Sequence, residues 1–389
     1  MSVIGNSHDL TYLDNAATSF PKPEIVYNTH DKVARTCCAN PGRAGHSLAH
    51  KASQIVLNAR LAVASFFNID DCAQIAFTSN ATEAINIALF GVLKAGDCVV
   101  TTSMEHNSVT RPLYELQRRG VNVVKVACDS SGHTSLGDIQ QACKLHPKLV
   151  IMSHCSNVTG SVQPIAAIGN WCREHDILFM VDAAQSAGVY PIDVESMAID
   201  LLAVPGHKSL MGPQGSGFLY VKKGVDVIPF KFGGTGTMSS QLEQPQQMPE
   251  HLECGTLNTP GLAALAEAIR YVEHQGIDNI RAKEQLLLNR LRFGLANIPE
   301  ITIYGPKVVE AGVLSFTIDE VDNAEVGFIL DRRFNIAVRV GLHCAPDAHR
   351  TIGSFPQGTI RVSLGHFNSE ADIDYFLHAI GEIVSQGFE

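Results

Sequence analysis

Short, nearly continuous hydrophobic runs alternate with segments of helical periodicity through the first two thirds of the chain. Such runs are typical of strands buried on both faces of a largely parallel sheet, because these strands have no polar face. We therefore expect a three-layer α/β domain built from repeated strand–helix units. The expected strands are Ile75–Thr78, Cys98–Thr102, Val121–Ala127, Leu149–His154, Ile177–Asp182, Leu201–Pro205 and Gly217–Val221. The expected helices between them are Thr82–Leu93, Ser108–Arg119, Leu136–Leu145 and Pro164–His175.

The pattern changes near Gly255–Gly261, where regular alternation gives way to longer helices and isolated strands. This arrangement predicts a second, smaller α+β domain. Its expected helices are Pro260–His274, Ile277–Ala296 and Ser369–Val384, and its expected strands are Ile301–Tyr304, Gly312–Thr317, Ala337–Val340 and Thr359–Ser363. We expect a large domain over residues 20–258 and a small domain formed by residues 1–19 together with 259–389.

Composition narrows the class of protein. The chain has 389 residues, 45% of them hydrophobic and 17% charged, which is enough for two sizeable cores. Its formal net charge of -10 disfavours nucleic acid and anionic membranes as partners, since both attract basic surfaces. The N-terminus resembles no secretory signal and no apolar run is long enough to span a bilayer, so we expect a cytoplasmic protein. The ten cysteines include no C-x-x-C pair and no zinc-finger spacing, so we expect reduced thiols and no metal site.

Polar residues follow several of the expected strands. In a parallel sheet, ligands collect at the carboxyl ends of the strands, so these residues are the first candidates for a site. Residues 79–82 (Ser-Asn-Ala-Thr) open a helix whose free N–H groups can bind an anion, although an ordinary helix cap is the simpler interpretation. His106 and Asn157 each follow a strand, where capping and turn residues are also common.

Asp182 and Lys208 follow two further strands and have more specific chemistry. A carboxylate at the end of an apolar strand is costly unless it meets a positive partner, such as a protonated pyridine nitrogen. A buried cap is the alternative for Asp182. Lys208 precedes a glycine-rich turn, and burial would lower its pKa enough for Schiff-base chemistry. Polar groups in order on five successive strand ends indicate one shared site.

The most specific motif is Asp182-Ala183-Ala184-Gln185 followed by Gly206-His207-Lys208, with Lys208 placed 208 − 182 = 26 residues after Asp182. With this motif and with Tyr12-Leu13-Asp14-Asn15-Ala16-Ala17-Thr18, the chain resembles the class V aminotransferase-like enzymes that use pyridoxal 5'-phosphate (PLP). Within them it resembles the cysteine desulfurase and selenocysteine lyase group, nearly end to end. The resemblance implies the fold type I of PLP-dependent transferases, PLP as cofactor and a homodimer with shared active sites.

The resemblance also implies roles at the cofactor. Lys208 matches the lysine that carries PLP as a Schiff base, Asp182 the partner of the pyridine nitrogen, and Gln185 the residue bound to the ring hydroxyl. His106 matches the catalytic histidine stacked on the ring. The positions that match phosphate ligands are Thr82, His207 and, from the partner subunit, Thr256. Ala81 stands where many related enzymes have a second threonine, so one phosphate contact is expected to be missing.

On the substrate side, Arg361 and Asn157 match residues that hold the substrate carboxylate, a task for which a bidentate arginine is well suited. The loop Asn40–His46 matches an active-site loop near the substrate and contains Arg43 and His46. Ala17, in the N-terminal motif, is also expected beside the substrate.

Cys344 separates the desulfurases from their relatives. It lies in Arg339-Val340-Gly341-Leu342-His343-Cys344-Ala345, which resembles the R-x-G-x-H-C segment of group II desulfurases. The resemblance implies conversion of L-cysteine to L-alanine, with a persulfide on Cys344 that passes to an acceptor such as a protein thiol. Three alternatives remain open: a lyase that releases selenide from L-selenocysteine, a class V aminotransferase or lyase that does not use Cys344, and a PLP-binding sulfur carrier without turnover. Cys155, two residues before Asn157, is interpreted as a core residue.

Overall fold

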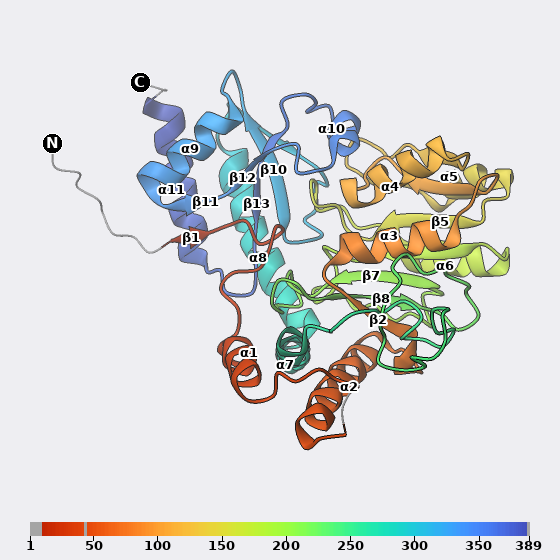
Figure 1. Ribbon diagram of the computed structural model, residues 1–389. Coiled ribbons are helices and arrows are strands. Elements are labelled where there is room, and N and C mark those ends of the chain that lie inside the picture. Colours follow the sequence, from red (N-terminus) through yellow and green to blue (C-terminus); the bar gives the residue numbers. More distant parts are fainter. Residues whose placement is uncertain (1–9, 43–44, 387–389) are drawn as a thin grey trace.

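The computed structural model describes residues 10–42 and 45–386 (Figure 1). A seven-stranded sheet in the order β2-β8-β7-β6-β5-β3-β4 forms the centre of the larger part. Its strands are β2 (Ile75–Thr78), β3 (Cys98–Thr102), β4 (Asn122–Val126), β5 (Leu149–Ser153), β6 (Leu178–Asp182), β7 (Leu201–Pro205) and β8 (Gly217–Val221). Only β8 runs antiparallel to its neighbours, and the other paired strands are parallel. The expectation of a largely parallel sheet is therefore confirmed.

Helices cover both faces of this sheet, which explains why strands such as β5 and β7 are buried along their whole length. On one face lie α3 (Ala81–Val92) and α4 (Asn107–Arg118). The other face is covered by α2 (Ser47–Phe67), α5 (Leu136–Ala142), α6 (Ile165–Glu174) and α7 (Thr259–Gln275). Short 3-10 turns, η1 (Cys72–Gln74) and η2 (Cys143–Leu145), precede β2 and follow α5. The three layers expected from the sequence are present.

A four-stranded antiparallel sheet in the order β12-β13-β10-β9 forms the smaller part. Its strands are β9 (Ile301–Tyr304), β10 (Val313–Ile318), β12 (Arg339–Gly341) and β13 (Thr359–Ser363). Packed against it around one apolar core are α8 (Ile277–Ala296), α9 (Asn323–Phe334) and α11 (Glu370–Gln386). Near the start of the chain, β1 (Thr11–Tyr12) pairs in parallel with β11 (Ile336–Ala337) and so joins this part. The exact domain boundaries stay a prediction.

Two further helices complete the fold. Helix α1 (Glu24–Thr36) packs on α7, where Val26 meets Ala264 and Ala268. Helix α10 (Pro346–Ile352) follows the segment that contains Cys344. Within residues 10–42 and 45–386, no helix is both long and apolar enough to cross a membrane.

The free edge of strand β2 is closed by side chains instead of by another strand. Arg60 of α2 donates from Nη1 to the carbonyl of Ile75, and Glu253 accepts from the N–H of Phe77 at 2.5 Å. The two charged groups are also paired with each other, at 2.9 and 3.0 Å, and both are buried. This pair fixes the segment around Glu253 against the sheet and satisfies backbone groups that an exposed edge would offer to other chains.

Candidate active site

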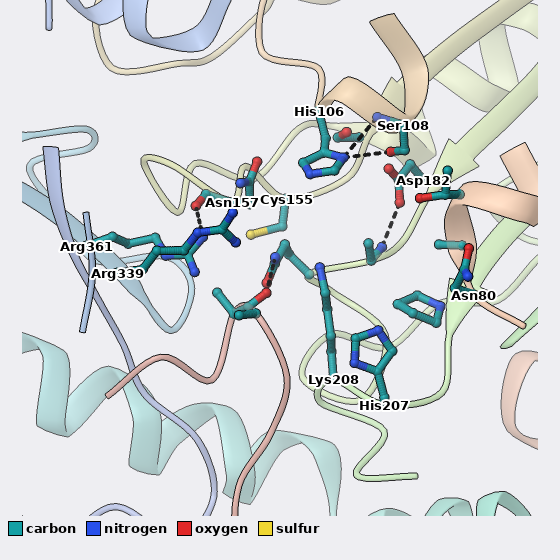
Figure 2. Close-up of a pocket in the computed structure, with 18 residues that line it drawn as sticks. Asn80, His106, Ser108, Cys155, Asn157, Asp182, His207, Lys208, Arg339 and Arg361 are labelled. Carbon is teal, nitrogen blue, oxygen red and sulfur yellow. Dashed lines mark hydrogen bonds between the residues drawn. The ribbon is translucent and has the colours of Figure 1, made fainter. Parts of the chain in front are cut away.

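A cavity of about 220 Å³ opens at the carboxyl ends of the large sheet, between the two parts of the molecule (Figure 2). The residues predicted from the sequence that line it are Ala17, Ala81, Thr82, His106, Asn157, Asp182, Gln185, His207, Lys208 and Arg361. The structure thus brings together residues that lie almost 350 positions apart in the chain, as the strand-end argument requires. The lining also includes residues whose individual roles were not predicted: Ala16, Asn80, Ser108, Ser153, Ala184, Pro205 and Arg339. Cys155, expected in the core, is buried and also lines the cavity.

Lys208 and Asp182 place two groups of opposite charge in the cavity. Burial lowers the pKa of Lys208 to about 8. The negative charge of Asp182 opposes this shift, and the positive charge of Arg361 adds to it. Asp182 accepts a hydrogen bond from the N–H of Ala184 at 2.9 Å and is only 3% exposed. Burial raises its pKa, against the effects of that bond and of Lys208. A lysine that can lose its proton near neutral pH therefore lies close to a buried carboxylate whose charged form a cationic partner would stabilise.

His106 caps helix α4 with its ring. Its Nδ1 accepts a hydrogen bond from the backbone N–H of Ser108 at 3.0 Å, and the Ser108 hydroxyl lies 2.9 Å from the same atom. Since a backbone N–H can only donate, Nδ1 carries no proton and the ring proton of the neutral imidazole is on Nε2. Burial lowers the pKa of His106 to about 4, and the charge of Lys208 adds to this effect. The Ser108 side chain also lowers the pKa of Asp182. His106 is therefore a neutral ring with one fixed tautomer.

A second buried carboxyl, Glu105, lies next to this histidine. It accepts hydrogen bonds from the hydroxyl of Thr102 at 2.6 Å and from the N–H and hydroxyl of Ser153 at 2.9 and 2.8 Å. Burial raises its pKa to about 7, with the negative charge of Asp182 adding to the shift. Glu105 thus fixes Ser153, which lines the cavity beside Asp182.

One end of the cavity suits an anion. Asn80 caps α3 by accepting the N–H of Glu83 at 2.9 Å, and it lines the cavity together with Ala81 and Thr82 from the first turn of the helix. The first turn of a helix offers free N–H groups and the positive end of the helix dipole. His207 reaches the cavity as well, with its Nδ1 3.1 Å from the hydroxyl of Thr18. This set fits a phosphate group.

Arg361 is ready to bind a carboxylate. Although it is only 1% exposed, it lines the cavity. Its Nη2 donates to Asp14 at 2.6 Å and its Nη1 donates to the carbonyl of Asn157 at 3.1 Å. Its Nε has no protein partner among the described residues. A buried unpaired N–H is costly, so an oxygen ligand at this nitrogen would be favoured.

The Cys344 loop is held from several sides. The carbonyl of His343 accepts from Nδ2 of Asn157 at 2.8 Å, and the carbonyl of Cys344 accepts from the N–H of Asn107 at 2.7 Å. Both His343 and Cys344 adopt left-handed backbone angles, with φ of 46° and 58°. Arg339, which lines the cavity, lies with Nη2 3.4 Å from the Cys344 sulfur. Arg339 and Asn157 therefore connect the cavity to the cysteine.

The ring of His343 points away from this chemistry. It is 2% exposed and its Nε2 lies 3.0 Å from the hydroxyl of Thr359. Burial lowers its pKa to about 2, with the charge of Arg361 adding to the effect. The ring supports the loop as a neutral group.

Two of the described residues that were predicted for the site, Thr256 and His46, lie outside the cavity of this chain. Thr256 borders a separate cavity of about 160 Å³ beside Ser79 and Glu83. His46 is exposed and caps α2 by accepting the N–H of Ala49 at 3.2 Å. The neighbouring residues 40–42 line another cavity, of about 320 Å³. Arg43 lies outside the described residues, so its predicted role stays a prediction.

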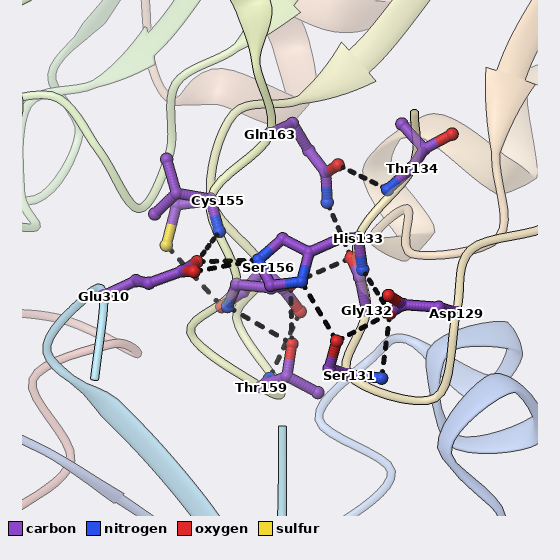
Figure 3. A network of polar contacts seen from close by, with 12 residues as sticks. Asp129, Ser131, Gly132, His133, Thr134, Cys155, Ser156, Thr159, Gln163 and Glu310 are labelled. Carbon is purple, nitrogen blue, oxygen red and sulfur yellow. Dashed lines mark hydrogen bonds and ion pairs between the residues drawn. The ribbon is translucent and has the colours of Figure 1, made fainter. Parts of the chain in front are cut away.

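A polar network fixes the turn that presents Asn157 (Figure 3). Glu310, on the segment before β10, lies 2.9 Å from Nε2 of His133 and accepts the N–H of Val162 at 2.7 Å. Val162 pairs with Cys155 across the turn. The other ring nitrogen of His133 lies 3.0 Å from the Ser131 hydroxyl, which also bonds to Asp129. The network thus ties both parts of the molecule to the back of the cavity.

Known proteins with similar sequences support a common origin for this arrangement. A family model described as aminotransferase class-V matches residues 11–376. The chain is 35% identical over 386 residues to a probable cysteine desulfurase of Methanothermobacter thermautotrophicus, covering 97% of this chain and 96% of that protein. It is 36% identical over 392 residues to a probable cysteine desulfurase of Pyrococcus abyssi, covering 97% and 95%. The apo structure of a cysteine desulfurase from Thermococcus onnurineus NA1 superposes with a TM-score of 0.92, at 33% identity, covering 97% of this chain and 95% of that one.

Proposed function

Because the chain belongs to the class V aminotransferase family, and within it to the cysteine desulfurases, we propose that it converts L-cysteine to L-alanine and transfers the sulfur through Cys344. The observation that carries this proposal is the position of Arg339. Its guanidinium group lines the Lys208 cavity and reaches the Cys344 sulfur at 3.4 Å. One substrate in the cavity can therefore be near both groups.

The cavity fits PLP as the cofactor. A lysine amine, a buried carboxylate, a flat histidine ring and a helix N-terminus correspond to the aldehyde, the pyridine nitrogen, the ring face and the phosphate of PLP. The residues that would hold it are Lys208, Asp182, Gln185, His106, Thr82 and His207. When bound, PLP withdraws electrons from the α-carbon of an amino acid and so makes its α-proton acidic.

The protein groups then act on the substrate. The Nε of Arg361 binds the substrate carboxylate, and Asn157 and Asp14 keep the guanidinium in place. Lys208, with its lowered pKa, takes the α-proton on Nζ and returns a proton to the carbon skeleton. His106 covers the cavity with its Nε2–H facing inward and keeps water out.

The sulfur leaves through Cys344. Its thiolate is the nucleophilic form, and Arg339 places a positive charge beside it. The Cys344 sulfur attacks the substrate sulfur, a sulfur–sulfur bond forms, and the bond between Cβ and sulfur in the substrate breaks. Protonation of the remaining skeleton gives alanine, and the persulfide passes its outer sulfur to an acceptor thiol.

We also propose that the protein acts as a homodimer with shared sites. Thr256 and His46 lie outside the cavity of their own chain, and both resemble residues that serve an active site. Contribution to the partner's cavity would account for their position.

The test is alanine release from L-cysteine and from L-selenocysteine, with dithiothreitol present, for the wild type, Cys344→Ala and Cys344→Ser. We expect the wild type to act on cysteine and both variants to lose this activity. Full activity of Cys344→Ala on cysteine would reject the persulfide step. Unimpaired activity of Cys344→Ala on selenocysteine, with a wild type almost inactive on cysteine, would identify a selenocysteine lyase instead.

A further inference from the structure

Lys22 is a partly buried lysine outside the cavity, in the segment between β1 and α1. Its Nζ donates to the carbonyl of Ser19 at 3.0 Å, to the Ser19 hydroxyl at 2.9 Å and to the carbonyl of His207 at 3.1 Å. All three acceptors are neutral. Among the described residues, no carboxylate is paired with Lys22, and burial alone lowers its pKa to about 8.

A partly buried ammonium group without a carboxylate partner loses part of its hydration without a compensating charge, so the position of Lys22 is less favourable than that of an exposed lysine. The contacts with Ser19 would be enough to close the local turn. The contact with His207 instead joins residues 185 positions apart. Lys22 therefore places its charge against the segment that leads into Lys208.

The carbonyl of His207 is the point where the two segments meet. Besides Lys22, it accepts from the N–H of Ser19 and from the hydroxyl of Thr18, each at 3.1 Å. The backbone between His207 and Lys208 is thus fixed from the N-terminal segment. These contacts fix the position of His207, which lines the cavity, and of Lys208, which follows it.

The charge of Lys22 also acts on the His207 ring. Burial lowers the pKa of His207 to about 4, and the charges of Lys208 and then Lys22 add to this effect. The same positive charge favours an anion at this end of the cavity, next to the first turn of α3.

We propose that Lys22 is a positioning residue for the phosphate end of the cofactor site, which fixes the His207–Lys208 backbone and adds a positive charge behind His207. This inference rests on the proposed function, because it assumes that a PLP phosphate occupies the space between α3 and His207. A phosphate monoester carries close to two negative charges near neutral pH, so it responds to a nearby cation that an uncharged ligand does not sense.

The experiment compares PLP with pyridoxal, which has the same ring and aldehyde but no phosphate. The full-length apoprotein is titrated with each compound, and the visible absorbance of the bound form gives the Kd. The variants are Lys22→Met, Lys22→Gln and Lys22→Arg. Lys148→Met is the matched control, because Lys148 also donates to a backbone carbonyl, that of Val92 at 2.7 Å. Lys148 precedes β5 and therefore lies at the end of this strand that is away from the cavity.

We expect Lys22→Met and Lys22→Gln to weaken PLP binding about tenfold while changing pyridoxal binding less than about twofold. Lys22→Arg should keep most of the affinity for PLP, and Lys148→Met should match the wild type with both compounds. Lys22→Gln can still donate to the His207 carbonyl, so it separates loss of charge from loss of structure if Lys22→Met does not fold.

Equal weakening of PLP and pyridoxal binding, or no change in either, would overturn the role of Lys22. A wild type that binds neither compound would instead reject the proposed function itself. The two failures are therefore distinguishable in one set of titrations.

Discussion

At the residue scale, the backbone N–H of Ser108 fixes the chemistry of His106. Because it donates to Nδ1, the ring can present only Nε2–H to the cavity and cannot take a proton at Nδ1 unless the cap of α4 breaks. His106 is thus suited to cover a ring and to donate a hydrogen bond, and it is poorly suited to act as a general base. The sequence indicated the histidine but not its tautomer, which depends on the helix cap.

The Ser108 hydroxyl should contribute to this arrangement beyond the backbone. We expect Ser108→Ala to lower kcat/KM for L-cysteine about threefold to tenfold, because the hydroxyl contacts His106 and lowers the pKa of Asp182. Ser108→Thr, which keeps the hydroxyl, should recover most of the activity. Ser135→Ala is the control, since Ser135 caps α5 away from the cavity. Steady-state kinetics with wild-type values for Ser108→Ala would exclude this role.

Asp14 allows a second test at the same scale. Its carboxylate holds Nη2 of the buried Arg361. We expect Asp14→Asn to raise KM for L-cysteine about tenfold with a smaller change in kcat, because a misplaced guanidinium weakens carboxylate binding first. A fall in kcat at unchanged KM would show that Asp14 acts on a later step.

At the element scale, the hydrophobic runs identify the strands well. The predicted bounds of β2, β3, β7 and β8 agree with the structure, because buried strands leave no polar position to confuse the pattern. The pattern did not indicate α1, α2, α9 or α10. In α2 the buried face consists largely of small residues such as Ala52 and Ala59, which mark an apolar stripe weakly. Arg60, on the same helix, is charged yet buried, because it pairs with Glu253 at the sheet edge.

Helix α8 contains a buried carboxyl whose effect on the stability of the protein depends on pH. Glu284 is 5% exposed, and burial raises its pKa to about 8 from an ordinary value of 4.5. Between these two values the folded state binds the proton more tightly than the unfolded chain does, so stability falls as pH rises through this range. The contribution of the protonated Glu284 carboxyl to the free energy of unfolding is complete below about pH 4.5 and lost above about pH 8.

We therefore expect Glu284→Gln to raise Tm more at about pH 8 than at about pH 5.5, because glutamine stays neutral at both. Thermal unfolding followed by circular dichroism measures this difference. Glu267→Gln on α7, where the side chain is more exposed, is the control. The same change in Tm at both pH values would mean that Glu284 does not change its protonation in this range.

At the scale of the whole molecule, many of the predicted site residues line one cavity, but the contacts that connect this cavity to the rest of the fold could not be predicted from the sequence. The residues at strand ends could be found because a parallel sheet gathers them at one edge. The contacts of Glu310 could not be predicted from the sequence, because they join loops that carry no periodic pattern. Glu310 contacts His133, and its carbonyl accepts from Tyr190 at 2.5 Å and from Gln285 at 3.3 Å. Arg339 belonged to a recognised motif, but only the fold brought it to the cavity.

This network should influence catalysis through the turn that holds Asn157. We expect Glu310→Gln to reduce kcat/KM for L-cysteine about fivefold to tenfold, while the absorbance of the bound cofactor stays unchanged. His133→Gln should cause a similar loss, and the double variant should be little worse than either single one, because both break the same link. Additive effects would show that the two side chains act independently.

The contacts that hold the Cys344 loop bear on how sulfur would leave the enzyme in the proposed reaction. Asn107 and Asn157 bind two successive carbonyls of the loop, and His343 is buried beneath it. Two adjacent residues in left-handed conformation leave little freedom for the backbone to swing outward. If Cys344 carries the sulfur as proposed, it would hold a fixed position, and an acceptor thiol would have to approach it. An acceptor protein would then need an exposed cysteine on a projecting segment, because the acceptor would have to span the distance to Cys344.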